Sequence, residues 1–347
     1  MFAGIFSFDV KFTYMNNQPK VAVVGGGSWG TALVKMLSEN LDTVGWYIRN
    51  DSIIRHLQQE GNNPQYISSA QFEVSKLDLS SNLDTVISNY DILIFAIPSA
   101  FLEAELQKAS VPLATKVVFS AIKGIVPETG LIVGEHFHER YQVPFESIGV
   151  ITGPCHAEEV ALERLSYLTI ACADTAKAEL VANQLKSHYI RTKISDDIIG
   201  TEYAAMLKNI YAIAAGIAHG LGYGDNFQSV LMSNAIREMK RFIACVHKMK
   251  RNINNSAYLG DLLVTGYSIF SRNRMFGNMI GKGYTVKSAM MEMNMVAEGY
   301  YAAKSAHDLM ERLEKKSKTP IIDAVHSILY KGKNPKKIFT KLTERLD

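Results

Sequence analysis

The chain has 347 residues, of which 47% are hydrophobic and 20% charged, a composition typical of a folded globular protein with ample material for a core. Its 37 basic and 34 acidic residues give a formal net charge of +3, which is too small to indicate binding to nucleic acid or to an anionic membrane. Three cysteines, Cys155, Cys172 and Cys245, without C-x-x-C spacing argue against a disulfide framework and against a zinc site.

The first twenty residues precede the first predicted strand. They lack the basic n-region, the long apolar stretch and the small-residue cleavage site of a signal peptide. No apolar stretch of the chain reaches the roughly 18–20 uncharged residues of a membrane span. We therefore expect residues 1–20 to be an N-terminal extension, with Met15 as an alternative start, and the protein to be cytoplasmic, in keeping with its cysteine usage.

The first predicted strand, VAVV (21–24), is followed by GGGSWG and then by an amphipathic helix. Gly25, Gly27 and Gly30 stand in G-x-G-x-x-G register: the first turns the chain tightly, the second lets backbone approach a pyrophosphate, and the third lets helix and strand pack closely. The helix N-terminus adds free N–H groups and a positive dipole end. This context predicts dinucleotide binding rather than an incidental glycine turn. Trp29 would either fill space within the loop or lie beside the diphosphate as one wall of the cofactor site.

The second predicted strand ends in VGWYIRN (44–50). An acidic residue at this strand end would hold the ribose 2′-hydroxyl of NAD, whereas Arg49 suits the 2′-phosphate of NADP. A solvated arginine at a strand end is the plain alternative. The sequence therefore indicates a nicotinamide dinucleotide, favours NADP slightly and leaves NAD open.

Short apolar runs alternate with helix-length segments from Val21 to about Ile170. Runs rich in β-branched residues, separated in this way, are typical of buried parallel strands with crossover helices, and so of a doubly wound α/β sheet. The predicted strands are VAVV (21–24), TVGWYI (43–48), DILIFAI (91–97), KVVFSAI (116–122) and SIGVITG (147–153).

The pattern becomes helical after SDDIIG (195–200), and few strand-like runs follow. We predict an α/β Rossmann-type dinucleotide-binding domain over residues 21–198, followed by an all-α substrate-binding and catalytic domain over residues 199–347. Within the second domain, SAMMEMNMV (288–296) is expected to be helix core filled with methionine, in preference to the alternative that it forms part of a cofactor site.

Four further segments place polar residues in apolar or glycine-rich surroundings. Lys123 follows a predicted strand, at the carboxyl end where open α/β sheets bind ligands. GPCHAEEV (153–160) is a second strand-to-helix turn, whose backbone N–H groups suit an anion or a cofactor edge. Lys208 lies among Ala, Leu and Ile on a predicted helix, where lost hydration lowers the pKa of an ammonium group. The segment LGDLLVTGYSIFSRNRMFG carries Asp261, Ser271, Arg272 and Asn273.

Taken singly, several of these residues have a plain structural explanation. Lys123 would be a solvated strand end, His156 a helix residue with satisfied hydrogen bonds, and Arg272 and Asn273 part of an ordinary turn. Their order along one chain is what carries a functional prediction.

Together, the segments resemble bacterial NAD(P)-dependent glycerol-3-phosphate dehydrogenase from about residue 20 to residue 300. The resemblance implies an active site in the cleft between two domains, reversible reduction of dihydroxyacetone phosphate to sn-glycerol 3-phosphate by NADPH or NADH, and supply of the product to phospholipid synthesis. The matching segments are GGGSWGTAL (25–33), NNPQYI (62–67), FAIPS (95–99), SAIKG (120–124), GPCHAEEV (153–160), LKNIYAIAAGIAHGLGYGDN (207–226), LGDLLVT (259–265), SRNRMFG (271–277) and VAEGY (296–300).

The resemblance also implies a role for each matching residue. Lys208 would be the catalytic proton donor and acceptor, Lys123 its partner near substrate and nicotinamide, and Asp261 a member of the same polar cluster. Further substrate contacts would come from Gly153, Cys155, Ser271, Arg272 and Asn273. Dinucleotide contacts would come from Gly25, Gly27, Ser28, Trp29, Gly30, Arg49, Lys123, Ala157, Arg272, Val296 and Glu298.

Two residues depart from the family pattern. Cys155 stands where a Ser or Thr hydroxyl is usual, which weakens a hydrogen bond there, and Gly266 stands where Cys is common. We expect a small-molecule substrate as the partner, with no metal, no nucleic acid and no membrane insertion, and a homodimer stays open. Two alternatives remain: a 6-phosphogluconate-type or β-hydroxyacid dehydrogenase, which shares the two-domain plan, and a non-catalytic dinucleotide sensor, which needs only GGGSWG.

Overall fold

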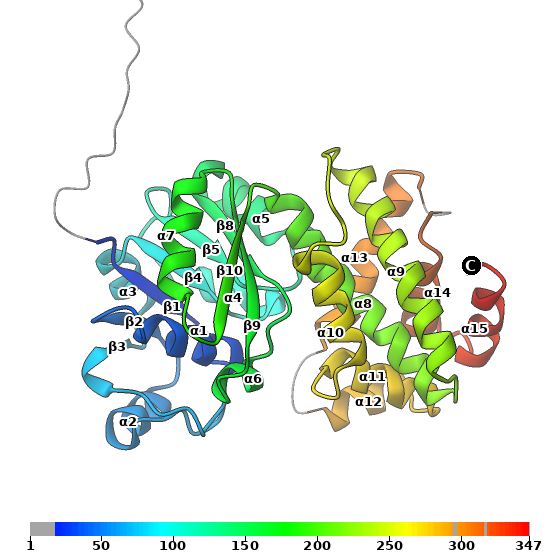
Figure 1. The fold of residues 1–347 in the computed structure, drawn as a ribbon, viewed down its shortest axis with the longest axis horizontal. Helices are drawn as coiled ribbons and strands as arrows, with labels where there is room; N and C mark the ends of the chain where they lie inside the picture. Colours follow the sequence, from blue (N-terminus) through cyan, green and yellow to red (C-terminus); the bar gives the residue numbers. More distant parts are fainter. Residues whose placement is uncertain (1–17, 294–296, 316–317, 347) are drawn as a thin grey trace, which may run out of the picture.

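The computed structural model describes residues 18–293, 297–315 and 318–346. Its first part forms a lobe around a β-sheet and its second part forms a helical lobe (Figure 1). The chain passes from the sheet to the helices between strand β10 (Ile190–Ser195) and helix α8 (Ile198–Gly220). This arrangement confirms the predicted fold class.

The first lobe is built on an eight-stranded sheet in the order β10-β9-β8-β5-β4-β1-β2-β3. The strand order reverses at β1, which lies between β4 and β2, and the carboxyl ends of strands at such a reversal form the ligand crevice of doubly wound sheets. Neighbouring strands run parallel throughout β1 (Val21–Val24), β2 (Val44–Tyr47), β3 (Leu77–Ser80), β4 (Ile92–Phe95), β5 (Val117–Ser120) and β8 (Ile148–Thr152).

All five predicted strands are present. Three further strands of this sheet, β3, β9 (Ser166–Cys172) and β10, are not predicted from the sequence. The sheet is also not purely parallel, because β9 pairs antiparallel with β8. β3 and β10 lie at the two edges and leave most of their residues partly or fully exposed, so neither shows the continuous apolar run of a buried strand. A separate pair of short strands consists of β6 (Ile125–Val126) and β7 (Leu131–Ile132).

Helices cover both faces of the sheet. Along β1, Val21 and Val23 join one apolar cluster while Ala22 and Val24 join the other, as expected where successive side chains point to opposite faces. One cluster includes residues of α1 (Ser28–Ser38), α2 (Asp51–Glu60), α6 (Ala157–Ala161) and α7 (Thr175–Leu185). The other includes residues of α3 (Leu83–Asn89), α4 (Ser99–Leu106) and α5 (Val133–Tyr141).

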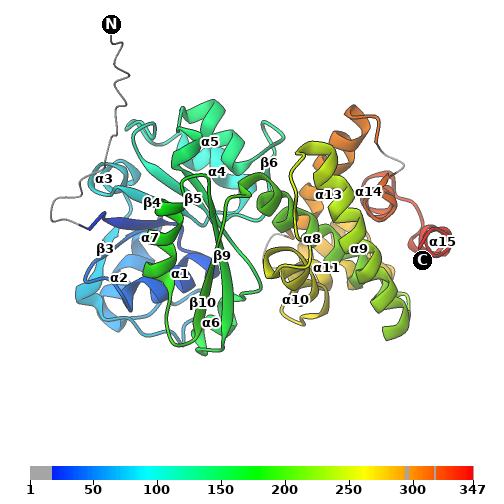
Figure 2. The same cartoon turned by 45° about the horizontal axis from the view of Figure 1, so that its top comes forward.

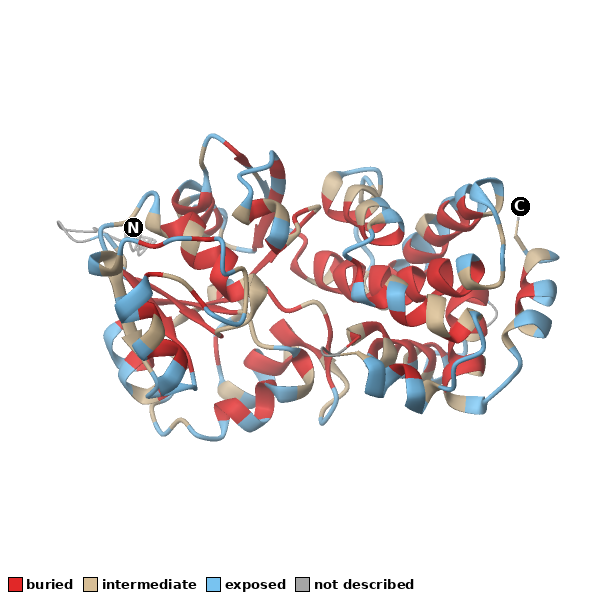
Figure 3. Ribbon diagram, turned by 90° about the horizontal axis from the view of Figure 1, so that it is seen from below, coloured by how far each residue is buried: buried red, intermediate tan, exposed pale blue. Residues whose placement is uncertain are grey.

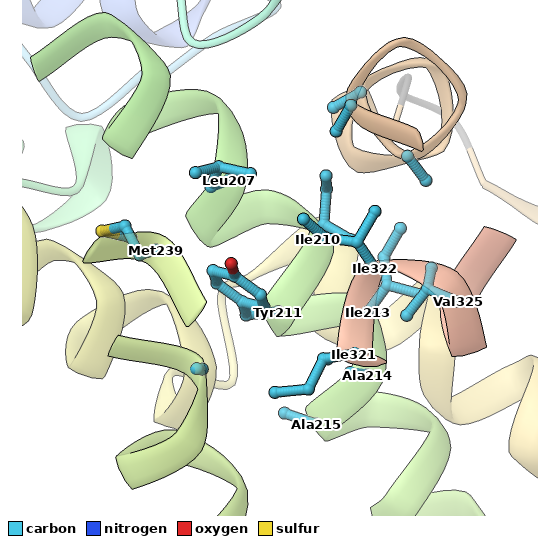
Figure 4. Packing of buried hydrophobic residues seen from close by; sticks show 14 of the residues in the cluster. Leu207, Ile210, Tyr211, Ile213, Ala214, Ala215, Met239, Ile321, Ile322 and Val325 are labelled. Atoms are coloured by element: carbon cyan, nitrogen blue, oxygen red, sulfur yellow. The ribbon is translucent and has the colours of Figure 1, made fainter. Parts of the chain in front are cut away.

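The helical lobe is organised around α8. This helix of 23 residues is apolar on nearly every side and almost entirely buried, which is the pattern of a central rather than a surface helix. Figure 4 shows Leu207, Ile210 and Tyr211 of α8 among side chains of the neighbouring helices, and Figure 3 shows the buried residues gathered inside each lobe. The elements packed against α8 are α9 (Asp225–Val246), a π-helical turn (Ser256–Gly260), α10 (Asp261–Tyr267), α11 (Arg272–Gly281), α13 (Glu298–Arg312) and α14 (Pro320–Lys331). Farther out, α12 (Val286–Glu292) packs on α11, and α15 (Pro335–Thr343) packs on α14 and α11.

Glycines bring α8 and α11 into backbone contact. A Cβ atom on Gly277 would lie 2.1 Å from the carbonyl oxygen of Ile213, and one on Gly216 would lie 2.1 Å from that of Arg274. Both distances are far inside van der Waals contact, so the two helices approach this closely only with glycine at the crossing. Since α11 begins at Arg272, the crossing fixes where that arginine stands relative to α8.

The predicted methionine-filled core helix is wrong. In α12 only Ala289 is buried, and Met291 is 77% exposed; residues 294–296 lie outside the described residues. Met290 and Met293 line a cavity instead. Within the described parts of the chain, we find no helix with the length and apolar character needed to span a membrane.

Candidate active site

A cavity of about 710 Å³ lies between the two lobes, within the size range of small-molecule and cofactor sites. Its wall on the sheet side comes from the segments that follow β1, β2, β4, β5 and β8, and its wall on the other side comes from α8 and α10 to α13. In Figure 2, α8, α10 and α11 lie on the side of the helical lobe that faces the sheet.

The glycine-rich loop forms one part of the wall and has the features of a diphosphate cradle. Gly25 has φ +134°, and a Cβ atom on Gly30 would lie 2.1 Å from the carbonyl oxygen of Gly25, so both positions require glycine. A Cβ atom on Gly27 meets nothing within 4 Å, which leaves its backbone open to the cavity. Because no side chain caps the start of α1, its first N–H groups are available to an anion. The loop therefore fits a dinucleotide.

Two buried side chains hold this loop in place. The Trp46 indole N–H donates to the carbonyl oxygen of Gly25 at 2.9 Å, and the Asn63 amide donates to that of Gly26 at 3.1 Å and to Thr31 Oγ1 at 2.9 Å. Asn63 is fully buried. NNPQYI (62–67) is one of the matching segments, but local sequence predicts no role for this asparagine, because its hydrogen bonds reach across more than thirty residues of sequence.

A buried ion pair lies deeper in the cleft. The Lys208 ammonium group on α8 donates to Asp261 Oδ1 at the start of α10, and Thr152 Oγ1 donates to Asp261 Oδ2 at 3.4 Å. Burial lowers the pKa of Lys208 to about 7; the carboxylate of Asp261 opposes this shift and the charge of Lys123 adds to it. Lys208 is therefore poised to exchange a proton near neutral pH.

Lys123 reaches this region from the segment after β5. The Asn209 amide on α8 donates to the backbone oxygen of Lys123 at 2.9 Å, which ties the two lysine-bearing segments together. The Lys123 ammonium group lies 5.1 Å from the ring centroid of Trp29, at a distance where a cation attracts the face of an indole. Lys123 thus stands between the glycine-rich loop and the buried ion pair.

The turn after β8 contributes Cys155 and His156. Burial raises the pKa of the Cys155 thiol to about 12, so the group is a neutral, weak donor and not a nucleophilic thiolate. Burial, and after it the charges of Lys123 and Lys208, lower the pKa of His156 to about 4. Both side chains line the cavity in neutral form.

The start of α11 brings an exposed guanidinium to the cavity. Ser271 caps the helix by accepting from the backbone N–H of Arg274 at 3.3 Å, and Asn273 Oδ1 accepts from the backbone N–H of Gly299 at 2.9 Å. These bonds orient the turn so that Arg272 lies in the cavity wall.

Glu298 joins the two lobes beside this turn. Ser99 donates to its carboxylate from the backbone N–H at 3.4 Å and from the hydroxyl at 3.5 Å. Burial raises the pKa of Glu298, against the charges of Arg272 and Lys123. Both cations line the same cavity as this carboxyl group, and their charges favour its ionised form.

Most of the residues predicted for the site lie in the cavity wall. Three of the others do not line the cavity: Gly30 packs against Gly25 in the loop, Gly153 directly follows β8, and Asp261 is paired with Lys208. Val296 lies outside the described residues. The predicted residues that line the cavity are Gly25, Gly27, Ser28, Trp29, Arg49, Lys123, Cys155, Ala157, Lys208, Ser271, Arg272, Asn273 and Glu298. Wall residues that the sequence patterns do not predict as part of the site include Tyr47, Phe101, Glu105, Phe270, Met290 and Tyr301.

One group of potential metal ligands occurs among the described residues, away from the cavity. His307, Asp308 and His326 place ligand atoms within 4.8 Å of one another. The two imidazole rings stack with centroids 3.6 Å apart and planes 16° apart. Lone pairs in the planes of stacked rings run side by side rather than toward a common point, so this geometry does not suit a shared ion.

Comparisons with known proteins match nearly the whole chain. The family model described as the NAD-dependent glycerol-3-phosphate dehydrogenase N-terminus matches residues 20–178, and the model of the C-terminus matches residues 197–340. The chain is 35% identical over 327 residues to glycerol-3-phosphate dehydrogenase [NAD(P)+] of an Exiguobacterium species, covering 94% of this chain and 95% of the relative. It is 32% identical over 333 residues to the Lactiplantibacillus plantarum protein of the same name, covering 94% and 97%.

Solved structures share the architecture. The crystal structure of glycerol-3-phosphate dehydrogenase from Coxiella burnetii superposes with a TM-score of 0.84 at 28% identity, covering 94% of this chain and 99% of that one. The Plasmodium falciparum glycerol-3-phosphate dehydrogenase structure superposes with a TM-score of 0.83 at 20% identity, covering 93% of this chain and 94% of that one. At that identity the similarity supports the fold only.

Proposed function

The chain belongs to the NAD-dependent glycerol-3-phosphate dehydrogenase family, and from this premise we propose how its residues carry out the reaction. The protein is an NAD(P)-dependent oxidoreductase that interconverts dihydroxyacetone phosphate and sn-glycerol 3-phosphate. In the forward direction the ketone carbon gains a hydride, its oxygen gains a proton, and the reduced nicotinamide is oxidised. The dinucleotide supplies the hydride, and the protein must supply the proton and hold the ketone.

The observation that carries the proposal is the position of Lys208. Its ammonium group is buried beside the same cavity that the glycine-rich loop lines, and its pKa is about 7. A group with that pKa can donate a proton to the developing alkoxide and can take it back in the reverse direction. Lys208 is therefore our candidate for the catalytic acid and base, with Asp261 orienting it.

Lys123 adds a second positive charge near the reacting oxygen. It acts electrostatically on Lys208 and lowers its pKa, and it would stabilise negative charge that develops on the ketone oxygen. The neutral side chain of Cys155 and the backbone near Gly153 complete the substrate contacts that we propose on this side.

Arg272 is our candidate for the substrate phosphate. A guanidinium group donates two parallel hydrogen bonds to phosphate oxygens, a geometry that lysine cannot reproduce. Ser271 and Asn273 fix the turn that presents it. The same arginine also lies near Glu298, on the side where we place the nicotinamide half of the cofactor.

We place the dinucleotide along the sheet side of the cavity. Its diphosphate would lie on the backbone of Gly25 and Gly27 and on the start of α1, with Gly30 allowing the close packing beneath. The adenosine would extend toward Arg49. The other proposed contacts on this path are Ser28, Trp29, Ala157 and Glu298.

The test is a direct assay of turnover. Dihydroxyacetone phosphate is added to the protein with NADH or NADPH, and absorbance at the reduced-nicotinamide band is followed. We expect the absorbance to fall. A non-catalytic dinucleotide sensor would leave it unchanged, and a 6-phosphogluconate-type or β-hydroxyacid dehydrogenase would respond only to its own substrates, which are tested in parallel.

We further propose a setting for this activity. The product would feed phospholipid synthesis, and the enzyme would work in the cytoplasm without nucleic acid or membrane insertion. Residues 21–198 and 199–347 would be its two domains, and a homodimer is the assembly that size-exclusion chromatography with light scattering should test.

A further inference from the structure

A carboxylate that the proposed function does not use lies at the Arg49 end of the cavity. Glu105 is on α4, one helical turn after Phe101, and both line the cavity together with Tyr47 and Arg49. Residues four apart share a face of a helix, so α4 presents an aromatic ring and a carboxylate to the same space. The end of the second strand is where doubly wound folds distinguish NAD from NADP.

Glu105 is fixed and ionised. Its residue is 5% exposed, the Tyr47 hydroxyl donates to Oε1, and the Lys108 ammonium group lies 2.9 Å from both carboxylate oxygens. Burial alone would raise the pKa of Glu105, but hydrogen bonds from Tyr47 and Lys108, with the charges of Lys108 and Arg49, outweigh it and hold the pKa below its usual value. The cavity wall therefore carries an ionised carboxylate at neutral pH, and the ammonium group that pairs with it belongs to a residue outside the cavity wall.

The two cations near Glu105 differ in what they offer a ligand. Arg49 lines the cavity and Lys108 does not, and the side chain of Lys108 is more than half exposed on its way to the carboxylate. Arg49 is thus the cation that a 2′-phosphate would contact, and its guanidinium group also interacts electrostatically with the carboxylate of Glu105.

We propose that Glu105 makes this enzyme prefer NAD to NADP, by setting a fixed carboxylate beside Arg49 at the adenosine end of the cavity. A ribose 2′-hydroxyl donates a hydrogen bond to a carboxylate, whereas a 2′-phosphate meets like charge there. The carboxylate comes from α4 and not from the end of β2. The arginine at position 49 alone therefore favours NADP, whereas Glu105 beside it favours NAD. This inference rests on the proposed function only in taking the cavity as the dinucleotide site.

The test measures binding of NADH and NADPH to the full chain by titration calorimetry, without triose phosphate. We expect the wild type to bind NADH at least about tenfold more tightly than NADPH, and Glu105→Gln to reduce that ratio at least about tenfold by tightening NADPH. Glu103→Gln is the matched control, because Glu103 lies on the same helix, is similarly buried and does not line the cavity. It should leave the ratio unchanged.

Two results would overturn the inference: a wild type that binds NADPH as tightly as NADH, or a Glu105→Gln variant that changes the ratio no more than Glu103→Gln. Should Glu105→Gln not fold, 5′-ADP and 2′,5′-ADP are compared on the wild type, where equal or tighter binding of 2′,5′-ADP would also overturn it. A chain that binds NADH selectively but does not reduce dihydroxyacetone phosphate contradicts the proposed function alone.

Discussion

Lys208 and Asp261 form an ion pair in which the lysine is 3% and the aspartate 1% exposed. The two residues come from different helices, and Thr152 at the end of β8 donates to the second oxygen of the aspartate. A buried pair of this kind rarely adds much stability, because desolvation offsets most of the attraction. What the pair provides here is a lysine whose pKa lies near neutrality at the wall of the cofactor cavity.

Replacing the lysine tests that role. We expect Lys208→Met to lower turnover of dihydroxyacetone phosphate by roughly 10²–10³, the usual effect of removing a general acid or charge stabiliser, while the dissociation constant for NADH stays within about twofold. Turnover comes from initial rates and binding from calorimetry. Lys193→Met, on an exposed position of β10, is the control and should change neither. Near-normal turnover in Lys208→Met would remove the lysine from the mechanism.

The same pKa sets a pH dependence with opposite signs in the two directions. Reduction needs the protonated Lys208, so its turnover should fall as pH rises through about 7. Oxidation of glycerol 3-phosphate needs the neutral amine and should rise through the same range. Because Asp261 raises the pKa of Lys208, Asp261→Asn should move both inflections to lower pH. Inflections that stay in place in that variant would assign them to another group.

The proposed contact between Arg272 and the substrate phosphate is tested by comparing substrates with and without the phosphate group. Loss of a charge-assisted pair costs about 1.5–3 kcal/mol, or roughly 10–150-fold in affinity, so Arg272→Ala should raise the KM for dihydroxyacetone phosphate by that factor. Dihydroxyacetone, which lacks the phosphate, is the control substrate. Its kcat/KM should be similar in the wild type and the variant, and an equal loss for both substrates would instead point to the cofactor.

Much of this site follows from local sequence patterns. The glycine loop, the lysine after β5 and the lysine on a helix of apolar residues each carry a signal within a few residues. What local patterns do not contain is the pairing of distant side chains. Asn63 under the glycine loop and Glu105 beside Arg49 act through contacts that exist only once α4 and the 62–67 segment pack against the sheet.

The edges of the sheet show the same limit. β3 and β10 are partly exposed, so their residues alternate or are polar and do not form an apolar run. The departure at Gly266 also gains an explanation from packing: a Cβ atom there would lie 2.7 Å from Met232 Sδ, so the methionine occupies the space that a larger residue at position 266 would need.

The crossing of α8 and α11 connects packing to substrate affinity. A methyl group on Gly277 would meet the backbone of Ile213, which cannot move aside as a flexible side chain can. We expect Gly277→Ala to lower the free energy of unfolding by about 1–3 kcal/mol, as overpacking does. It should also raise the KM for dihydroxyacetone phosphate more than it lowers kcat, because α11 carries Arg272 at its start while Lys208 stays on α8. Gly224→Ser is the control: Gly224 is the N-cap of α9 with φ −87°, a position that serine favours, and a Cβ atom there meets nothing within 4 Å. Thermal unfolding and steady-state kinetics of the two variants should therefore diverge, and equal behaviour would mean that the glycine crossing does not set the position of the arginine.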